Sequence, residues 1–531
     1  MRFKQIHFLI LLLWAFLVVL GLTSRTYFPI DETRYATVAW NMWLNNDYLV
    51  PYLNGIAYSH KPPLLFWLMN LGWKIFGVND WWPRLIPSLF ALASLYVTRK
   101  ISALLWPNNE SIKDIASLVL MSCGLWVVYS TALMFDMMIA FFTTLGIWGL
   151  LLALNEPSKK GWILLALAFG GGLLAKGPTI LLQLLPVALL APWWARRKLP
   201  FKAWYLPIVY SVLAGIIIVL CWAIPAGIHG GSQYQHDIFW GQTANRMVNS
   251  FAHGRPAWWY LAILPLLLFP WLFLGTFWKG LTNSKALLNE IGLRFCMAWL
   301  VPVFIGFSLI SGKQVHYVLP IFPAFALIIA RYISITKNIG KLDLLPISIA
   351  FVAVGMIWLF IPYYASSHTI SVVGWKHLPL WPGLFAIGLG MFLYFSLKNF
   401  SAVSVTSISS IALISVSMFV LIHTAGEAYD VRPISKEIKN LELQQVPVAY
   451  LGRYTGSYNF LGRLHHSPKN VTLATIGSWF DAHPNGRVVV FFDNIEQVDK
   501  SQTEFAQAYK GMVIAVLNQH QFSLQKNPDV Q

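Results

Sequence analysis

Apolar segments of about 20 residues recur along most of the chain, and each is as long as a helix needs to be to cross a lipid bilayer. The chain has 531 residues, of which 57% are hydrophobic and 11% are charged. Soluble proteins carry about 25% charged residues. A larger soluble core cannot absorb this surplus of apolar residues, because single cores stop growing at about 250–300 residues. The sequence therefore predicts an all-α polytopic membrane protein.

We predict about 13 transmembrane helices, each of roughly 17–25 residues, in a membrane domain that covers residues 1–425. The first span follows Met1-Arg2-Phe3-Lys4 without a small-residue cleavage motif, so we expect it to remain uncleaved. The predicted spans are residues 7–27, 83–106, 114–132, 135–154, 162–177, 179–195, 205–225, 258–278, 292–311, 315–334, 344–363, 379–397 and 403–424.

Lysine and arginine residues gather in alternate links between these segments, for example Arg99-Lys100 and Arg196-Arg197-Lys198. These links lie on the same side of the membrane as the N-terminus, and the positive-inside rule places that side in the cytoplasm. An odd number of spans then places the C-terminus on the outer face. Topology and contact with anionic lipids account for the formal net charge of +17, so we expect no nucleic-acid partner.

Three long segments fall on the outer face: residues 28–82, residues 226–257 and the tail from residue 426 to 531. The first is rich in aromatic residues, which predicts amphipathic helices lying in the membrane interface. The tail alternates apolar, β-rich runs with helix-like stretches, which predicts a small α/β domain. The β-rich runs are Val446–Leu451, Val488–Phe492 and Met512–Leu517, and the helix-like stretches include Ile434–Leu443 and Glu504–Tyr509.

An acidic pair, Asp31-Glu32, follows the first span and is accompanied by Arg34 and Tyr35. A carboxylate at the outer end of a span can act as a general base or bind a cation. The alternative interpretation is an ordinary solvated turn.

The segment Tyr58-Ser59-His60-Lys61-Pro62-Pro63 holds a lysine beside a rigid pair of prolines. Such a fixed point charge suits a phosphate group. The alternative is a lysine that snorkels to the membrane interface.

Asp136 lies at the start of the fourth predicted span, directly after the short link that follows the third. An ionised aspartate near hydrocarbon costs on the order of 2.5–3.5 kcal/mol, so it is a functional candidate. If the short link lies in water, Asp136 is instead an ordinary loop residue.

The later outer loops carry further cationic and phenolic side chains. Arg246 and Arg255 are candidates for bidentate contacts with phosphate. Lys176, Lys313 and Tyr317 are candidate phosphate partners, whereas the alternative for both lysines is a tight turn with a snorkelling side chain.

Two histidines, His60 and His253, lie in outer segments that are far apart in sequence. Histidine is a common metal ligand, so the pair could share a metal ion.

All of these candidates share one property, because the predicted topology places them on the outer face. Acids, cations and aromatic rings then converge over a bundle that faces lipid. This arrangement suits a substrate with an anionic head group and a long apolar tail. Fixed cations would hold a leaving phosphate, and a carboxylate would activate an acceptor hydroxyl.

Together these motifs resemble those of the GT-C membrane glycosyltransferases of the protein O-mannosyltransferase superfamily, and among them chiefly the bacterial aminoarabinose transferases that modify lipid A. The resemblance covers spans one to ten, and the C-terminal region matches in layout. The matching motifs are Asp31-Glu32…Tyr35, Tyr58…Lys61-Pro62-Pro63, Asp136, Lys176-Gly177-Pro178, Arg246…Pro256…Trp258-Trp259-Tyr260 and Lys313…Tyr317…Leu319-Pro320.

The resemblance implies a GT-C fold in the bacterial inner membrane, with a periplasmic C-terminal domain. It implies inverting transfer of a sugar from undecaprenyl phosphate to lipid A at the periplasmic face, without an obligatory metal. Asp31 would be the catalytic carboxylate and Asp136 a further essential acid. The donor phosphate would be bound by Lys61, Arg246, Tyr317 and Lys313, and the cavity would be lined by Glu32, Tyr35, Tyr58, Lys176 and Arg255.

The chain also departs from the pattern of the aminoarabinose transferases. His60 stands where they tend to have glutamate, and Gln242-Thr243 stands where they carry a Glu-His pair. A structural divalent metal such as zinc would then depend on His60 and His253. The same departures leave another amino sugar or a hexose open as the donor.

Three other functions are consistent with parts of the sequence. A secondary transporter would place its charges near the bilayer midplane in internally repeated halves, whereas here they gather at one face and no repeat is evident. A protein O-mannosyltransferase would share the donor chemistry. A non-catalytic assembly partner would tolerate the loss of Asp31.

Overall fold

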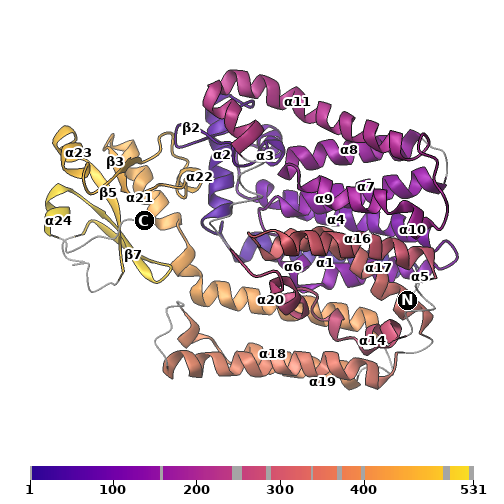
Figure 1. Ribbon diagram of the computed structural model, residues 1–531. Helices are drawn as coiled ribbons and strands as arrows, with labels where there is room; N and C mark the ends of the chain where they lie inside the picture. Colours follow the sequence, from indigo (N-terminus) through magenta and orange to yellow (C-terminus); the bar gives the residue numbers. More distant parts are fainter. Residues whose placement is uncertain are drawn as a thin grey trace.

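The computed structural model describes residues 3–155, 159–241, 254–282, 289–336, 339–367, 374–395, 401–493 and 503–524. A large helical bundle carries a smaller domain, built on a β-sheet, at one end (Figure 1). The N-terminus lies at the end of the bundle opposite this domain (Figure 1). The chain is therefore a mainly helical membrane protein with a small C-terminal sheet domain, as the sequence predicts.

Within the described ranges, eight helices are long and apolar enough to cross a membrane. They are α1 (Phe3–Ser24), α4 (Trp81–Leu105), α7 (Asp136–Asn155), α11 (Tyr205–His236), α16 (Ile291–Leu309), the pair η3 (Val315–Ile321) and α17 (Phe322–Ile335), α18 (Lys341–Ser367) and α20 (Ala402–Ala425). The predicted total of 13 is not confirmed by these eight helices and stays a prediction.

Several predicted spans consist of shorter helices joined end to end. The third is divided at Cys123, whose extended backbone separates α5 (Glu110–Ser122) from α6 (Gly124–Ser130). Prolines account for other interruptions, because a proline cannot donate the helical backbone hydrogen bond. The remaining short segments are α9 (Thr179–Leu189), α10 (Ala191–Ala195), α13 (Trp259–Leu267), η2 (Trp271–Phe273), α14 (Gly275–Thr282) and α19 (Trp381–Phe395).

Glycine allows two neighbouring bundle helices to approach closely. A Cβ atom on Gly149 of α7 would lie 2.6 Å from the carbonyl oxygen of Gly161, in α8 (Lys159–Lys176). Small residues at such crossings let the backbones pack directly, which is a main source of attraction between helices in lipid. This packing brings the end of α8, with Lys176, alongside the start of α7, with Asp136.

The first outer segment folds into two helices, α2 (Asp31–Asn45) and α3 (Leu64–Phe76), joined through a two-stranded ribbon of β1 (Tyr52–Leu53) and β2 (Ile56–Ala57). The prediction of helices is confirmed, but α2 does not lie freely on the membrane surface. Tyr35, Val38, Ala39 and Met42 are buried, because α2 lies between the bundle and the C-terminal domain (Figure 1).

The C-terminal domain contains a five-stranded mixed sheet in the order β4-β3-β5-β7-β6. Strand β3 is parallel to both of its neighbours, whereas β7 is antiparallel to β5 and β6. The three predicted β-rich runs form β3, β5 and β7, and the predicted helix at residues 434–443 is part of α21. The elements are β3 (Val448–Leu451), β4 (Lys469–Val471), β5 (Arg487–Phe492), β6 (Phe505–Tyr509), β7 (Met512–Leu517), α21 (Arg432–Leu443), α22 (Asn459–Gly462), α23 (Ile476–Ala482) and α24 (Gln519–Leu524).

The helix-like interpretation of Glu504–Tyr509 is wrong, because this segment is strand β6. Tyr509 pairs with Met512, so a two-residue turn of Lys510 and Gly511 joins β6 to β7. Both turn residues have positive φ, 50° and 88°, which matches the twist of a two-residue hairpin. Pairing with the buried strand β7 therefore outweighs the local helix preference.

The C-terminal domain is anchored to the outer helices by Phe460, which is 1% exposed. Its ring stacks on Trp73 of α3 at 5.0 Å and meets the edge of Tyr27 at 5.4 Å. Around this ring, Thr37 Oγ1 donates to the Gly456 carbonyl at 2.6 Å and Trp40 Nε1 donates to the Leu464 carbonyl at 2.8 Å. These contacts fix the sheet domain directly over α2.

Candidate functional site

Asp31 occupies the first turn of α2, where the positive end of the helix dipole favours a carboxylate. Its Oδ1 atom accepts a hydrogen bond from the Tyr35 hydroxyl at 3.3 Å and is ion-paired with Arg34. The side chain is 48% exposed, so the carboxylate remains open to solvent or substrate. Burial raises the pKa of Tyr35 well above its usual value, so its hydroxyl stays protonated and continues to donate.

Glu32 points away from Asp31 and into the protein, where it is 4% exposed. Its two oxygens pair with Arg25 at 2.5 and 2.8 Å. They also accept hydrogen bonds from the backbone N–H groups of Phe28 and Leu133, both at 2.7 Å. Glu32 therefore holds α2 against Arg25 and Leu133, and its predicted place in the cavity lining stays a prediction.

The Arg25–Glu32 pair is part of a larger clamp around the outer end of α1. Arg25 Nη2 also donates to the Thr131 carbonyl at 2.8 Å. Arg84 of α4 donates to the carbonyls of Arg25 and Leu22, both at 2.5 Å. The clamp joins α1, α2, α4 and the link before α7 in a single charged network.

Asp136 is 1% exposed and lies in a second cluster at the start of α7. Its carboxylate is ion-paired with Lys176 and lies 3.9 Å from His316 Nε2. The Lys176 ammonium stands 4.6 Å from the ring centroid of Tyr317. The structure thus brings together three of the predicted residues from three separate elements.

Phe135 joins the two clusters. The Tyr35 ring meets its edge at 4.9 Å, and the Lys61 ammonium lies 5.6 Å from its ring centroid. Lys61 is also within electrostatic range of Asp136, and Asp31 is within electrostatic range of His316. Asp31 and Lys61 therefore lie near the same cluster, and their predicted roles in a site stay predictions.

Tyr58 supports the Lys61 segment from the same side. It is 6% exposed, and its ring stacks on His60 at 5.2 Å. It also contacts Phe66 of α3 at 6.4 Å. Tyr58 therefore packs beneath the loop that carries Lys61 and is within electrostatic range of Arg34 and Tyr35.

Lys313 has a different environment from the one predicted. Its ammonium donates to the backbone carbonyls of Arg255 at 2.8 Å and Ile310 at 2.5 Å. It ties the end of α16 to the chain before α13, where Gly254 and Gly312 form an isolated bridge. Lys313 therefore supports this turn, and its predicted phosphate contact stays a prediction. The guanidinium carbon of Arg255 lies 5.7 Å from the centroid of the Trp259 ring.

Two predicted site residues, Arg246 and His253, lie outside the described residues. Among the residues that the structure does describe, no group of three or more His, Cys, Asp or Glu side chains could hold a metal ion. The metal predicted at His60 and His253 stays a prediction.

Two residues of the site were not among the predicted set. His316 Nδ1 and the Tyr129 hydroxyl are 3.1 Å apart, and the pair contacts Asp136 through the other ring nitrogen. His316 directly precedes Tyr317 in a motif that the sequence did single out, which was the available signal. Tyr129 lies inside an apolar run and gave no such signal.

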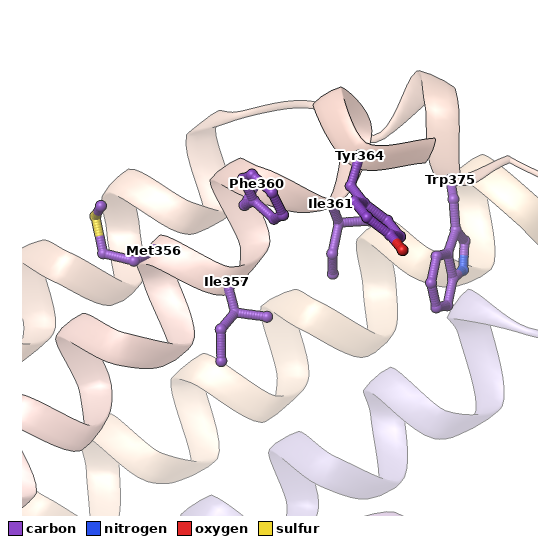
Figure 2. Close-up of a pocket in the computed structure, with 6 residues that line it drawn as sticks. All are labelled: Met356, Ile357, Phe360, Ile361, Tyr364 and Trp375. Carbon is purple, nitrogen blue, oxygen red and sulfur yellow. The ribbon is translucent and has the colours of Figure 1, made fainter. Parts of the chain in front are cut away.

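An apolar cavity of about 430 Å³ lies apart from this site, on α18 and η4 (Trp375–His377). Figure 2 shows its lining residues, which include Met356, Phe360 and Trp375. Among the described residues, its lining consists of aliphatic and aromatic side chains and includes no acid or cation.

Comparison with known proteins finds similarity to membrane glycosyltransferases. Residues 60–222 match the family model described as dolichyl-phosphate-mannose-protein mannosyltransferase. The chain is 30% identical over 338 residues to undecaprenyl phosphate-alpha-4-amino-4-deoxy-L-arabinose arabinosyl transferase 2 of Proteus mirabilis, a match to 62% of this chain and 60% of that protein. The corresponding transferase of Yersinia enterocolitica is 29% identical over 396 residues, 69% of this chain and 70% of that protein. The match to the Proteus protein thus spans less than two thirds of its length.

The fold is also that of a solved structure. The crystal structure of ArnT from Cupriavidus metallidurans bound to undecaprenyl phosphate superimposes with a TM-score of 0.76 and 16% sequence identity. The match covers 96% of this chain and 97% of that one. The shared architecture therefore includes the C-terminal domain as well as the bundle.

The Arg25–Glu32 pair predicts a pH-dependent stability. Burial alone would raise the pKa of Glu32, but Arg25 and the two backbone donors outweigh it and hold this pKa below its ordinary value of 4.5. The stabilisation is therefore present above pH 4.5 and is lost as the pH falls through the lower, folded-state pKa. Glu32→Gln should destabilise the protein by about 3–5 kcal/mol at neutral pH, because Arg25 is left buried without a counter-charge.

Thermal unfolding in detergent across acidic to neutral pH measures this effect. The difference between Glu32→Gln and the wild type should shrink as the pH falls. Glu110→Gln is the control, because Glu110 is 74% exposed in its pair with Lys113. An equal loss of stability in the two variants would contradict the stabilising role of the Arg25–Glu32 pair.

The Asp136–Lys176 ion pair predicts that a second substitution, at Lys176, compensates for the loss of stability caused by a substitution at Asp136. Asp136→Asn should destabilise the chain by about 3–5 kcal/mol, because it leaves the Lys176 charge buried without its partner. Asp136→Asn combined with Lys176→Met should recover most of that loss. The unfolding temperature of the purified protein checks this, and an additive loss in the double variant would show that the two residues are not coupled.

Proposed function

The chain belongs to the GT-C membrane glycosyltransferases of the protein mannosyltransferase family, and from this premise we propose that it transfers a sugar from undecaprenyl phosphate to an acceptor at the outer face of the membrane that it spans. The observation that carries the proposal is that Lys61 and Tyr35, whose hydroxyl donates to Asp31, both lie against the Phe135 ring. A half-exposed carboxylate and two lysines are then all within electrostatic range of His316. Inverting transfer of a phosphate-linked sugar needs both groups.

In this proposal the donor phosphate lies against Lys61, with Lys176 and Tyr317 beside it. These groups stabilise the negative charge that builds on the phosphate oxygen as the bond from the sugar C1 atom to that oxygen breaks. The electron pair of that bond leaves with the phosphate. Arg246 remains a proposed partner of the same phosphate.

Asp31 acts on the acceptor. An acceptor oxygen attacks C1 from the face opposite the departing phosphate, and its proton passes to the Asp31 carboxylate. Arg34 and the Tyr35 hydroxyl hold that carboxylate in place through its Oδ1 atom. In this proposal the other carboxylate oxygen receives the proton. No protein-bound sugar intermediate is needed.

We further propose that the sugar is 4-amino-4-deoxy-L-arabinose and that the acceptor is lipid A. The names of the relatives from Proteus mirabilis and Yersinia enterocolitica support this sugar. His60 and Gln242-Thr243 depart from the pattern of that subgroup. Another amino sugar is therefore the main alternative donor.

Protein O-mannosylation is the second candidate function. The family model over residues 60–222 supports it, because its description names a protein mannosyltransferase. The two functions share the donor phosphate chemistry and differ in the acceptor. Only the identity of the labelled product separates them.

Replacing Asp31 in cells that lack the gene tests the proposal. Mass spectrometry of lipid A should show an aminoarabinose mass increment with the wild-type chain and none with Asp31→Asn, since loss of a general base costs about 10²–10⁴-fold in rate. Asp31 is half-exposed, so the variant should reach the membrane at wild-type levels. Glu110→Gln is the matched control and should retain the modification.

Each contrary outcome has a distinct meaning. If lipid A is unmodified and a glycoprotein carries the mass increment, the acceptor is protein and not lipid A. Full modification by Asp31→Asn would refute the catalytic role of Asp31 and favour a non-catalytic function.

A further inference from the structure

A row of three side chains leads from α6 to the carboxylate of Asp136. The Tyr129 hydroxyl of α6 lies 3.1 Å from His316 Nδ1 in η3, and the centroids of the two rings are 5.3 Å apart. On the other side of the imidazole, His316 Nε2 lies 3.9 Å from Asp136 Oδ2. The opposite oxygen of this carboxylate, Oδ1, is the one that pairs with Lys176. His316 is 6% exposed and Asp136 is 1% exposed, so protein encloses both side chains.

The segment that carries His316 is held in place just before the site. The buried Tyr260 hydroxyl donates to the Gln314 carbonyl at 2.7 Å, and the Lys313 ammonium donates to two backbone carbonyls at the same turn. The Tyr317 N–H donates to the Gln314 carbonyl at 3.2 Å, where η3 begins. The backbone of His316 is therefore fixed on its N-terminal side, as a residue that orients another side chain requires.

The surroundings of the imidazole favour one of its neutral forms. Lys176 already compensates the charge of Asp136, which favours a neutral ring. In a neutral imidazole one nitrogen carries the proton and the other has a lone pair, and the Tyr129 hydroxyl suits either form because it donates or accepts. A lone pair on Nε2 would face the negative charge of Asp136 at 3.9 Å. The favoured form therefore has its proton on Nε2 and accepts from Tyr129 at Nδ1.

His316 contacts both of the groups that restrain the Lys176 ammonium. Lysine ends in a compact charge on a flexible stem. Here the charge is paired with Asp136 and stands 4.6 Å from the centroid of the Tyr317 ring. The His316 ring meets the Tyr317 ring edge to face at 4.9 Å, and its Nε2 faces Asp136. A shift of this one imidazole would therefore displace both restraints on the cation.

We propose that Tyr129 and His316 are positioning residues that orient Asp136, and through it the Lys176 ammonium, toward the donor phosphate. The inference rests on the proposed function, in which Lys176 lies beside that phosphate, and adds two residues that act through others. Tyr129 fixes the His316 ring, His316 faces one oxygen of Asp136, and Lys176 pairs with the other. The ammonium then needs no rearrangement as charge develops on the phosphate, which is the arrangement that stabilises a transition state most.

Tyr129→Phe removes the hydroxyl and keeps the ring. It should weaken the binding of undecaprenyl phosphate to the purified chain in nanodiscs by about three- to tenfold, because one hydrogen bond to the positioning imidazole is lost. Tyr210→Phe is the matched control, since Tyr210 is 60% exposed on α11, and it should bind like the wild type. Unchanged affinity in Tyr129→Phe would overturn the inference.

Two substitutions of His316 separate the roles of its ring nitrogens. Glutamine places a donor nitrogen near the position of Nε2, whereas asparagine places it near Nδ1. His316→Gln should therefore keep the affinity for undecaprenyl phosphate within about threefold, and His316→Asn should lower it about tenfold. Thermal unfolding checks that both variants are folded. A role in packing alone predicts an equal loss of affinity in both variants, and that result would overturn the inference.

A double-mutant comparison shows whether the effect of Tyr129 passes through Lys176. In a chain that carries Asp136→Asn and Lys176→Met together, Tyr129→Phe should cause no further loss of undecaprenyl phosphate binding. A further loss as large as in the wild-type background would overturn the route through Lys176. Sugar transfer to lipid A is measured separately. A wild-type chain that binds undecaprenyl phosphate and transfers no sugar would overturn the proposed function, whereas the binding series alone decides the positioning role.

Discussion

The buried ion pair between Arg25 and Glu32 is the constraint on which the site depends. Glu32 follows Asp31 directly, and it accepts a hydrogen bond from Leu133, three residues before Asp136. One carboxylate therefore sets the position of both acids relative to each other. Because a buried charge is costly without its partners, the network tolerates little displacement. The two clusters can then meet at Phe135 with a defined geometry.

The second constraint is the docking of the C-terminal domain. Phe460 and its surrounding hydrogen bonds hold the sheet domain on α2 and α3, the helices that also carry Asp31 and follow Lys61. Docking of the domain therefore also helps to fix the helix that carries Asp31.

The sequence predicted many residues of the candidate site but fewer of the residues that hold them in place. Asp31, Lys61, Asp136, Lys176 and Tyr317 were singled out because charged and phenolic residues are rare beside apolar spans, and the structure groups them. The contacts of Glu32 and Lys313 were not predicted, since sequence does not reveal whether a charged side chain points to a cavity or to a backbone carbonyl.

The C-terminal domain illustrates a different limit. Its buried strands were evident from their apolar runs, but Glu504–Tyr509 was interpreted as a helix because its pairing with β7 is a tertiary effect. The hydrophobic pattern alone also did not determine the number of membrane crossings, because short helices joined at bends look like single spans in the sequence.

Equilibrium binding of undecaprenyl phosphate to the purified chain tests most directly whether Lys61 binds the donor phosphate while Asp31 acts on the acceptor. The account predicts that Lys61→Met weakens binding by at least about tenfold, because a charge-assisted contact to phosphate is lost. Asp31→Asn should leave the affinity nearly unchanged, since Asp31 serves the acceptor. Unchanged affinity in Lys61→Met, or an equal loss in Asp31→Asn, would contradict this division.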